Sequence, residues 1–291
     1  MGAAGGRLRR AAVLVTGGRG LLGAQVCRQL DGAAGRVQLL QQDVRELETL
    51  TQRFDIVCHL AGITKVDAGH DARALCDVNV TGTLAVLEYC RSSGARCVLA
   101  SSAAVYRPAA GGARLAEASP LGPGPVYGIS KMVAEDCCRY YAKRHGVPTT
   151  VLRIFNLYGP GQDPDFLVPY VIQQLVRLEP VVLRTPNAVR DFVYVADVAD
   201  AIVHACAYEP SPFAVFNVGS GSGLAVRELV ERAAAQLGVE PQVATQGPVP
   251  AGDAVVADCR AVEAALGWTA QTGIEEGLAR MLQHSALPVR G

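Results

Sequence analysis

Three glycines stand at intervals of three residues near the start of the chain. Gly17, Gly20 and Gly23 follow a short apolar run that ends at Thr16, and an apolar helical pattern comes next. Between a strand and a helix, such a loop binds the pyrophosphate of a dinucleotide: Gly17 allows a tight turn, Gly20 lets the backbone approach the phosphates, and Gly23 permits close helix–strand packing. The free N–H groups and positive dipole end of the helix then face the phosphate. We therefore predict a dinucleotide site at this loop.

An arginine inside this loop bears on the choice of cofactor. The predicted second strand ends near Gln41, so a 2′-phosphate on the adenosine ribose meets no acidic side chain at that point, and Arg19 can pair with it. The alternative is a solvated loop arginine. The cofactor is therefore NAD or NADP, and Arg19 is a hint of NADP. Asp43 either contacts the adenine or ribose or caps the helix that follows it.

A tyrosine and a lysine can supply acid–base chemistry. Tyr127 and Lys131 are four residues apart, which places them on one face of a predicted helix. The ordinary pKa of tyrosine is about 10. A nearby ammonium and the positive charge of an oxidised nicotinamide both favour the phenolate, so we predict a lowered pKa. A phenolate takes the proton of a substrate hydroxyl while hydride leaves the same carbon. Ser101 and Ser102 end a predicted strand, where a serine either hydrogen-bonds the reacting oxygen or caps the strand.

Strand-like and helix-like segments alternate through the first half of the chain and must position these groups. Apolar runs predict strands at residues 11–16, 37–40, 55–61, 96–101 and 149–155, and helical periodicity predicts helices at residues 21–30, 47–53, 71–92 and 126–145. This alternation is typical of an α/β protein with a Rossmann-type doubly wound parallel sheet. Only about 30 residues separate the glycine loop from the strand at 55–61, so we predict that the sheet is trimmed near its second strand.

After Asn156 the pattern loosens, and glycine and proline interrupt it. We predict an NAD(P)-binding Rossmann domain at residues 11–156. A smaller C-terminal α/β substrate lobe is predicted at residues 157–291, with some segments that return to the first domain. Helical periodicity in this lobe predicts helices at residues 166–178, 197–208, 226–237 and 274–283.

Composition and charge argue against several classes of protein. The 291 residues are 50% hydrophobic and carry no formal net charge, which favours a globular core and gives no sign of nucleic acid or a membrane surface as partner. No apolar run approaches the roughly 20 residues of a membrane span. The basic segment with Arg7, Arg9 and Arg10 is expected to be a solvated tail. The nine cysteines lack metal-ligand spacing, so we expect no metal site and a cytoplasmic location.

Seven motifs in order resemble the extended short-chain dehydrogenase/reductase family that acts on nucleotide sugars. They are T-G-G-R-G-L-L-G at 16–23, H-L-A-G at 59–62, N-V-T-G-T at 79–83, S-S-A-A-V-Y at 101–106, Y-G-I-S-K at 127–131, R-I-F-N-L-Y-G-P-G at 153–161 and R-D-F-V-Y-V-A-D at 190–197. The likeness covers roughly residues 11–285. It implies the Rossmann fold, a bound NAD or NADP and a nucleotide-sugar substrate.

The resemblance also implies a role for individual residues. The catalytic set would be Ser102, Tyr127 and Lys131, with Asn79 near the lysine in a hydrogen-bond relay. The substrate set would be Ser102, Asn156, Arg190 and Asp253. Of these, Asn156 and Arg190 hold the diphosphate, for which arginine is well suited, and Asp253 contacts the nucleotide ribose. A salt bridge, for example with Asp191, is the alternative for Arg190. The cofactor set would be Gly17, Arg19, Gly20, Leu21, Leu22, Gly23, Asp43, Val44, Leu60, Ala61, Gly62, Asn79, Tyr127 and Lys131.

Two alanines narrow the reaction. The family's 4,6-dehydratases carry an Asp-Glu pair directly after the catalytic hydroxyl, and its sugar decarboxylases carry a glutamate at the second of these positions. Ala103 and Ala104 stand there instead, and alanine transfers no proton. Both eliminations are therefore disfavoured.

Three hypotheses remain. The first is an NAD(P)-dependent nucleotide-sugar epimerase that oxidises the sugar C4 transiently, with Tyr127 as general base. The second is an NADPH-dependent nucleotide 4-keto-sugar reductase, favoured by Arg19, Gln41 and the short cofactor half. The third is a non-catalytic dinucleotide-binding regulatory protein, against which the Ser102, Tyr127 and Lys131 set argues. The resemblance further suggests a homodimer through the helices at 71–92 and 126–145.

Overall fold

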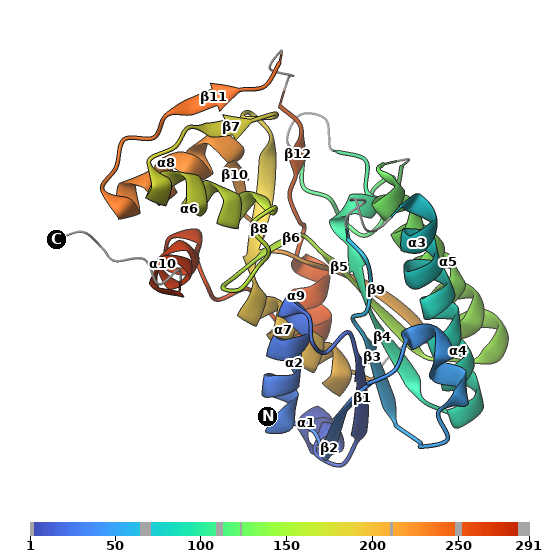
Figure 1. Ribbon diagram of the computed structural model, residues 1–291. Coiled ribbons are helices and arrows are strands. Elements are labelled where there is room, and N and C mark those ends of the chain that lie inside the picture. The colour runs from blue at the N-terminus through green and yellow to red at the C-terminus, as the bar shows by residue number, and fades with distance from the viewer. Residues whose placement is uncertain are drawn as a thin grey trace.

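The computed structural model describes residues 3–64, 71–108, 113–122, 124–209, 212–247 and 252–284. Its main feature is a six-stranded parallel sheet in the order β2-β1-β3-β4-β5-β9 (Figure 1). The strands are β1 (Ala12–Thr16), β2 (Arg36–Leu39), β3 (Ile56–His59), β4 (Arg96–Ser102), β5 (Thr149–Ile154) and β9 (Phe213–Val218). The predicted doubly wound sheet is confirmed.

The sheet is trimmed on the side of its second strand, as predicted. In the part of the chain that the structure describes, β2 alone lies beyond β1, and β3 pairs with the other edge of β1. A single 3₁₀ helix, η1 (Val44–Thr49), connects β2 to β3 in place of the helix expected at 47–53. The chain therefore reverses direction across the sheet at β1. Ligands of such sheets bind at the carboxyl end of the strands where the order reverses, which is where the glycine loop lies.

Helices cover both faces of this sheet (Figure 1). On one face, α2 (Leu21–Asp31) and α7 (Val195–Ala207) pack over Val15, and on the other, α4 (Gly82–Ser93) and α5 (Val126–His145) pack over Leu14. Successive side chains of a strand point to opposite faces, and helices cover both faces of this sheet. Leu14 and Val15 are therefore both fully buried. This explains the continuous apolar runs in the strands.

The long helix expected at 71–92 is interrupted. It consists of α3 (Ala72–Cys76), a π-helical turn, η2 (Asp77–Thr81), and α4. Asp71 begins it, because its carboxylate accepts a hydrogen bond from the N–H of Ala74 at 2.8 Å. Single π turns occur frequently at functional sites, and this one contains the buried Asn79.

The second lobe is built around β8 (Val189–Tyr194). Three short strands pair with it: β6 (Asn156–Tyr158), β10 (Gly223–Ala225) and β12 (Ala254–Val255). Its helices are α6 (Leu167–Arg177), α8 (Val226–Leu237) and α10 (Ile274–His284), and β7 (Val181–Leu183) pairs with β11 (Val243–Thr245) at its far edge (Figure 1). Although β9 and α7 come after residue 157, they complete the first sheet and its helical cover. The boundary between 11–156 and 157–291 stays a prediction.

Two helices differ from the sequence-based expectation. The expected N-terminal tail forms α1 (Ala3–Leu8), whose Leu8 is buried in the core beside α7 and whose Arg7 pairs with Glu209. The prediction of a solvated tail holds for the exposed side chains of Arg7, Arg9 and Arg10 and is wrong for Leu8, which anchors the helix in the core. A helix that the periodicity did not indicate, α9 (Arg260–Leu266), also packs on α7. Among the residues that the structure describes, no helix is long and apolar enough to cross a membrane.

Candidate active site

Two glycines of the loop after β1 are required by the protein's own packing. Gly17 has φ +69°, and a Cβ there would lie 2.6 Å from the backbone nitrogen of Ala61. A Cβ on Gly23 would collide with the carbonyl oxygen of Gly17. The requirement is different at Gly20, where a Cβ would meet only that same oxygen, at 3.4 Å. Gly20 is the residue before α2, and the first N–H groups of that helix have no acceptor within the helix itself.

The structure places Arg19 and Asp43 in different settings. The Arg19 guanidinium donates to the Gln41 side-chain oxygen at 2.5 Å. Both residues are exposed and lie just after the carboxyl ends of β1 and β2. Asp43 caps η1 by accepting from the N–H of Arg45 at 2.9 Å, and the Arg45 guanidinium also pairs with it at 2.6 Å. These hydrogen bonds lower the pKa of Asp43 to about 2. The capping alternative for Asp43 is therefore observed, and the next residue, Val44, is buried against Gly82.

The segment after β3 joins the glycine loop to the helical residues. Ala61, which follows Leu60, donates its N–H to the Thr16 hydroxyl at 3.2 Å. A Cβ on Gly62 would lie 3.0 Å from Oδ1 of Asn79 and 3.2 Å from Nζ of Lys131. Glycine at 62 thus lets the backbone pass between these two side chains. The predicted proximity of Asn79 and Lys131 is observed at this point.

Asn79 is held on several sides. Its amide accepts from the N–H of Ile63 at 2.8 Å and donates to the carbonyl of the same residue at 2.9 Å. It also donates to the Ser130 hydroxyl at 3.0 Å, and that hydroxyl donates to the backbone oxygen of Tyr127 at 2.8 Å. The π turn therefore ties the segment after β3 to the first turn of α5.

A buried histidine that the sequence reasoning did not single out completes this arrangement. His59 Nδ1 lies 2.7 Å from the Thr16 hydroxyl, and its Nε2 lies 3.1 Å from the Thr83 hydroxyl, which donates to the Asn79 carbonyl at 2.7 Å. Burial, together with the charge of Lys131, lowers the pKa of His59 to about 3, so the ring is neutral. Its place at the start of H-L-A-G was the available signal, because His59 directly precedes the predicted cofactor residues at 60–62.

Ser102, Tyr127 and Lys131 come together where β4 meets α5. The Ser102 hydroxyl caps the strand end by accepting from the N–H of Ala104 at 3.1 Å, and it also hydrogen-bonds the Tyr127 side chain. Lys131 is buried and donates to the carbonyl of Ala100 at 3.0 Å. Burial lowers its pKa to about 8, against the opposing charge of Glu135.

In the protein without a cofactor, the pKa of Tyr127 is raised and not lowered as predicted. Burial raises the pKa of this phenol, and the hydrogen bond from Ser102 opposes the rise. The chain's own side chains therefore do not produce the predicted depression, because the apolar surroundings outweigh them.

Three of the predicted substrate residues lie on β6, β8 and the segment before β12, and the fourth, Ser102, lies at the end of β4. Asn156 donates to the backbone oxygen of Asp191 at 3.1 Å, which links β6 to β8. Arg190 forms an ion pair with Asp253 at 2.9 Å, and both side chains keep contact with solvent. The alternative partner, Asp191, is wrong: it is fully buried and accepts instead from the N–H groups of Gly221 and Ala257, and from Ser220.

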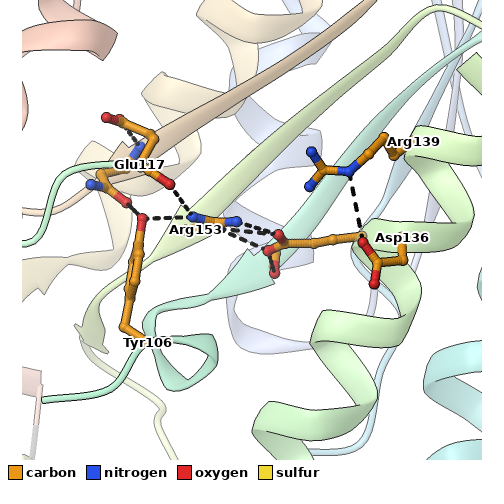
Figure 2. A network of polar contacts seen from close by, with 8 residues as sticks. Tyr106, Glu117, Asp136, Arg139 and Arg153 are labelled. Atoms are coloured by element: carbon orange, nitrogen blue, oxygen red, sulfur yellow. Dashed lines mark hydrogen bonds and ion pairs between the residues drawn. The ribbon is translucent and has the colours of Figure 1, made fainter. Parts of the chain in front are cut away.

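A second polar network lies next to the catalytic set and was also missed by the sequence reasoning. Arg153 on β5 contacts the Tyr106 hydroxyl at 2.9 Å and the Glu117 backbone oxygen at 2.9 Å (Figure 2). On its other side it pairs with Glu135 of α5 at 2.6 Å. Arg153 and Tyr106 had each appeared in a motif, but Glu117 and Glu135 had not, and the partners of a buried charge lie too far along the chain for spacing to indicate.

A cavity of about 490 Å³ lies elsewhere in the second lobe, between β10 and the segment 270–275. Phe192, Ser220, Arg232 and Gln271 are among its lining residues. None of the predicted site residues lines it.

The fold and the glycine loop, with the Tyr-x-x-x-Lys helix beside the end of β4, are those of a short-chain dehydrogenase/reductase. A family model described as the NAD dependent epimerase/dehydratase family matches residues 13–219. The chain therefore belongs to this family, which is of the extended short-chain dehydrogenase/reductase type, and the resemblance drawn from the motifs is confirmed.

Individual relatives and solved structures agree with this assignment. UDP-glucose 4-epimerase 1 of Oryza sativa subsp. japonica is 30% identical over 328 residues, with 91% of each chain covered. The structure of MoeE5 in complex with UDP-glucuronic acid and NAD superposes with a TM-score of 0.85 at 31% identity, covering 94% of this chain and 98% of that one. The structure of RMD from Pseudomonas aeruginosa complexed with NADPH superposes with a TM-score of 0.85 at 28% identity and the same coverage.

Proposed function

We propose that this protein is an NAD(P)-dependent nucleotide-sugar 4-epimerase with Tyr127 as its general base. The observation that carries the proposal is the meeting of Ser102, Tyr127 and Lys131 at the carboxyl edge of the sheet, beside the segment 60–62 that borders the glycine loop. The relatives named UDP-glucose 4-epimerase support it, and they suggest a uridine diphosphate sugar as substrate.

The loop after β1 fits a dinucleotide. Packing inside the protein explains the glycines at 17 and 23 but leaves Gly20 open, as expected if a ligand approaches the backbone there. The N-terminus of α2 supplies N–H groups for a pyrophosphate. A nicotinamide dinucleotide held by this loop would supply a reversible hydride acceptor for the sugar C4.

The chain's own residues supply the proton chemistry. Tyr127 takes the proton of the C4 hydroxyl and returns a proton to the same oxygen after the sugar has turned. Ser102 donates a hydrogen bond that stabilises the phenolate, and the positive charge of Lys131 stabilises it further. Ala103 and Ala104 transfer no proton, so they do not support elimination of water from the oxidised sugar. The ketone can then be reduced back to an alcohol.

The substrate residues hold the nucleotide while the sugar moves. Arg190 suits the diphosphate because its guanidinium forms two parallel hydrogen bonds with phosphate oxygens. Asn156 lies on the strand that pairs directly with β8, and Asp253 lies against Arg190, where a carboxylate can accept from ribose hydroxyls.

The decisive experiment has two readouts. The purified protein is denatured and any released nucleotide identified, and the native protein is incubated with UDP-glucose and the product analysed for the C4 epimer. Retained NAD together with epimerisation supports the proposal, because a cofactor that is regenerated in each turnover can stay bound. An empty protein that consumes NADPH with a 4-keto sugar identifies the reductase instead, and cofactor binding with no turnover identifies the regulatory protein.

A further inference from the structure

The ion pair of Glu135 and Arg153 is buried between α5, β4 and β5. Its side chains are 1% and 3% exposed, and the two charged groups meet through three hydrogen bonds of 2.6 to 3.1 Å. A buried pair of this kind holds its geometry only when the remaining polar atoms are also satisfied. Arg153 meets this condition, because its other donors reach Tyr106 and the backbone of Glu117 (Figure 2).

Glu135 has a third partner that connects the pair to the proposed catalytic residues. The Ser101 hydroxyl donates to its carboxylate at 2.5 Å. Ser101 directly precedes Ser102 on β4, and Glu135 lies one helical turn after Lys131 on α5. One carboxylate therefore joins the strand that carries Ser102 to the helix that carries Tyr127 and Lys131.

Ser101 and Ser102 are consecutive at the end of β4, so fixing Ser101 also fixes the backbone from which Ser102 extends. The Ser101 hydroxyl points to Glu135, and the Ser102 hydroxyl contacts Tyr127. A sideways or axial shift of α5 on β4 would break both contacts together. The short Ser101–Glu135 bond opposes such a shift.

The carboxylate also acts on Lys131 through charge. The charged and titratable groups that face Lys131 are Glu135, Cys138 and Tyr127 on α5 and His59 on β3, with Arg153 of β5 behind the carboxylate. Burial lowers the pKa of Lys131 to about 8, and Glu135 is the first of the groups that oppose this fall. Without the carboxylate, the buried Arg153 would remain as an unbalanced positive charge behind it.

We propose that Glu135 is a positioning residue, which fixes α5 against the end of β4 through Ser101 so that Ser102 and Tyr127 meet, and which places a negative charge one turn from Lys131. The expected loss in kcat rests on the proposed function. The expected shift in the titration of Lys131 can be measured without any assay of turnover.

The test uses three variants of the full-length protein. Glu135→Gln keeps the size of the side chain and removes its charge, and Ser101→Ala removes only the bond to β4. Asp136→Asn is the matched control, because Asp136 is the next residue on α5 and forms an exposed pair with Arg139 at 3.7 Å (Figure 2). For each protein, kcat and KM are measured against pH, and the lysine side chains are titrated by NMR. The sequence contains only Lys65, Lys131 and Lys143, so the signals can be assigned.

We expect Glu135→Gln to lower kcat roughly tenfold to hundredfold through misplacement of Ser102 and Tyr127, with KM for the nucleotide sugar nearly unchanged. Its Lys131 signal and the alkaline limb of its pH profile should both move about one unit toward lower pH. Ser101→Ala should lower kcat without moving the Lys131 titration, and Asp136→Asn should match the wild type.

The inference is overturned if Lys131 titrates in Glu135→Gln as in the wild type, if Ser101→Ala keeps the wild-type kcat, or if Asp136→Asn loses as much activity as Glu135→Gln. If Glu135→Gln does not fold, the kcat of Ser101→Ala decides the matter alone. If the wild type turns over no nucleotide sugar, the proposed function fails, and the Lys131 titration still decides the role of Glu135.

Discussion

Arg190 pairs with Asp253, which lies 63 positions further along the chain, and not with the adjacent Asp191. Arg190 and Asp191 have different partners because consecutive side chains of β8 point in opposite directions. Asp191 points inward, where burial raises its pKa and four hydrogen bonds from the segments at 220–221 and 257 hold it. Arg190 and Asp253 are left facing solvent together, available to a ligand.

The Arg190 side chain should govern substrate affinity. Replacing it by methionine removes charged hydrogen bonds to the diphosphate, each worth about 1.5–3 kcal/mol. We expect KM for the nucleotide sugar to rise roughly tenfold to hundredfold, with kcat changed much less. Arg184→Met is the control, because Arg184 is an exposed arginine of the same lobe that donates to Gln246. Equal KM values for wild type and Arg190→Met would remove Arg190 from the substrate site.

Tyr127→Phe tests the general base directly. The variant loses the hydroxyl that carries the proton, so we expect kcat to fall by about 10²–10⁴. Cofactor binding and the thermal melting temperature should remain close to those of the wild type. Tyr140→Phe serves as the control, since Tyr140 lies on the same helix and is 57% exposed. Retention of most of the activity in Tyr127→Phe would end the assignment.

His59 should make the fold sensitive to acid. Its pKa is about 3 in the folded protein and about 6.5 when unfolded, so below pH 6.5 the unfolded state binds the additional proton. Stability is therefore full above that pH and falls as the pH drops toward 3, by a total on the order of 4 kcal/mol from this residue.

The measurement is the free energy of unfolding in urea at several pH values. His59→Gln should show a shallower loss between pH 6.5 and 4 than the wild type. His145→Gln, which changes an exposed histidine at the end of α5, should keep the wild-type slope. Parallel slopes for wild type and His59→Gln would contradict the prediction.

Arg19 tests the choice between NAD and NADP. If Arg19 pairs with a 2′-phosphate, Arg19→Ala should raise KM or Kd for NADP(H) about tenfold and leave NAD(H) nearly unchanged. Gln41→Glu places a negative charge 2.5 Å from the same guanidinium and should weaken NADP(H) selectively as well. An equal effect on both cofactors would contradict the pairing of Arg19 with a 2′-phosphate.

The proposed homodimer can be tested on α5. Ile129, Val133 and Tyr140 are apolar side chains on this helix and are between 42% and 57% exposed, an arrangement that a second copy of the helix would cover. We expect Val133→Asp to shift the protein toward the monomer in sedimentation or light scattering. Leu178→Asp, at a 72% exposed site on the other lobe, should not. A wild type that is already monomeric refutes the dimer.

Local chemistry was predictable from the sequence, and long-range pairing was not. Gly17 and Gly23 stand where spacing placed them, because a glycine loop between a strand and a helix depends on a dozen consecutive residues. The partners of Arg153 and His59 come from segments 18 to 47 and 24 to 43 residues away, so no local pattern indicates them. The rise in the pKa of Tyr127 in the protein alone could not be predicted from local pattern, because burial depends on the whole of the surrounding packing.

The pairing of β9 with β5 has a consequence for how the chain folds. During synthesis, the first five strands of the main sheet emerge well before Phe213–Val218, with the segments of the second lobe in between. Until β9 arrives, the edge of β5 exposes unpaired N–H and C=O groups, which can pair with other chains. A fragment that stops at residue 156 would keep that edge open permanently, so it should aggregate even though it contains the entire glycine loop.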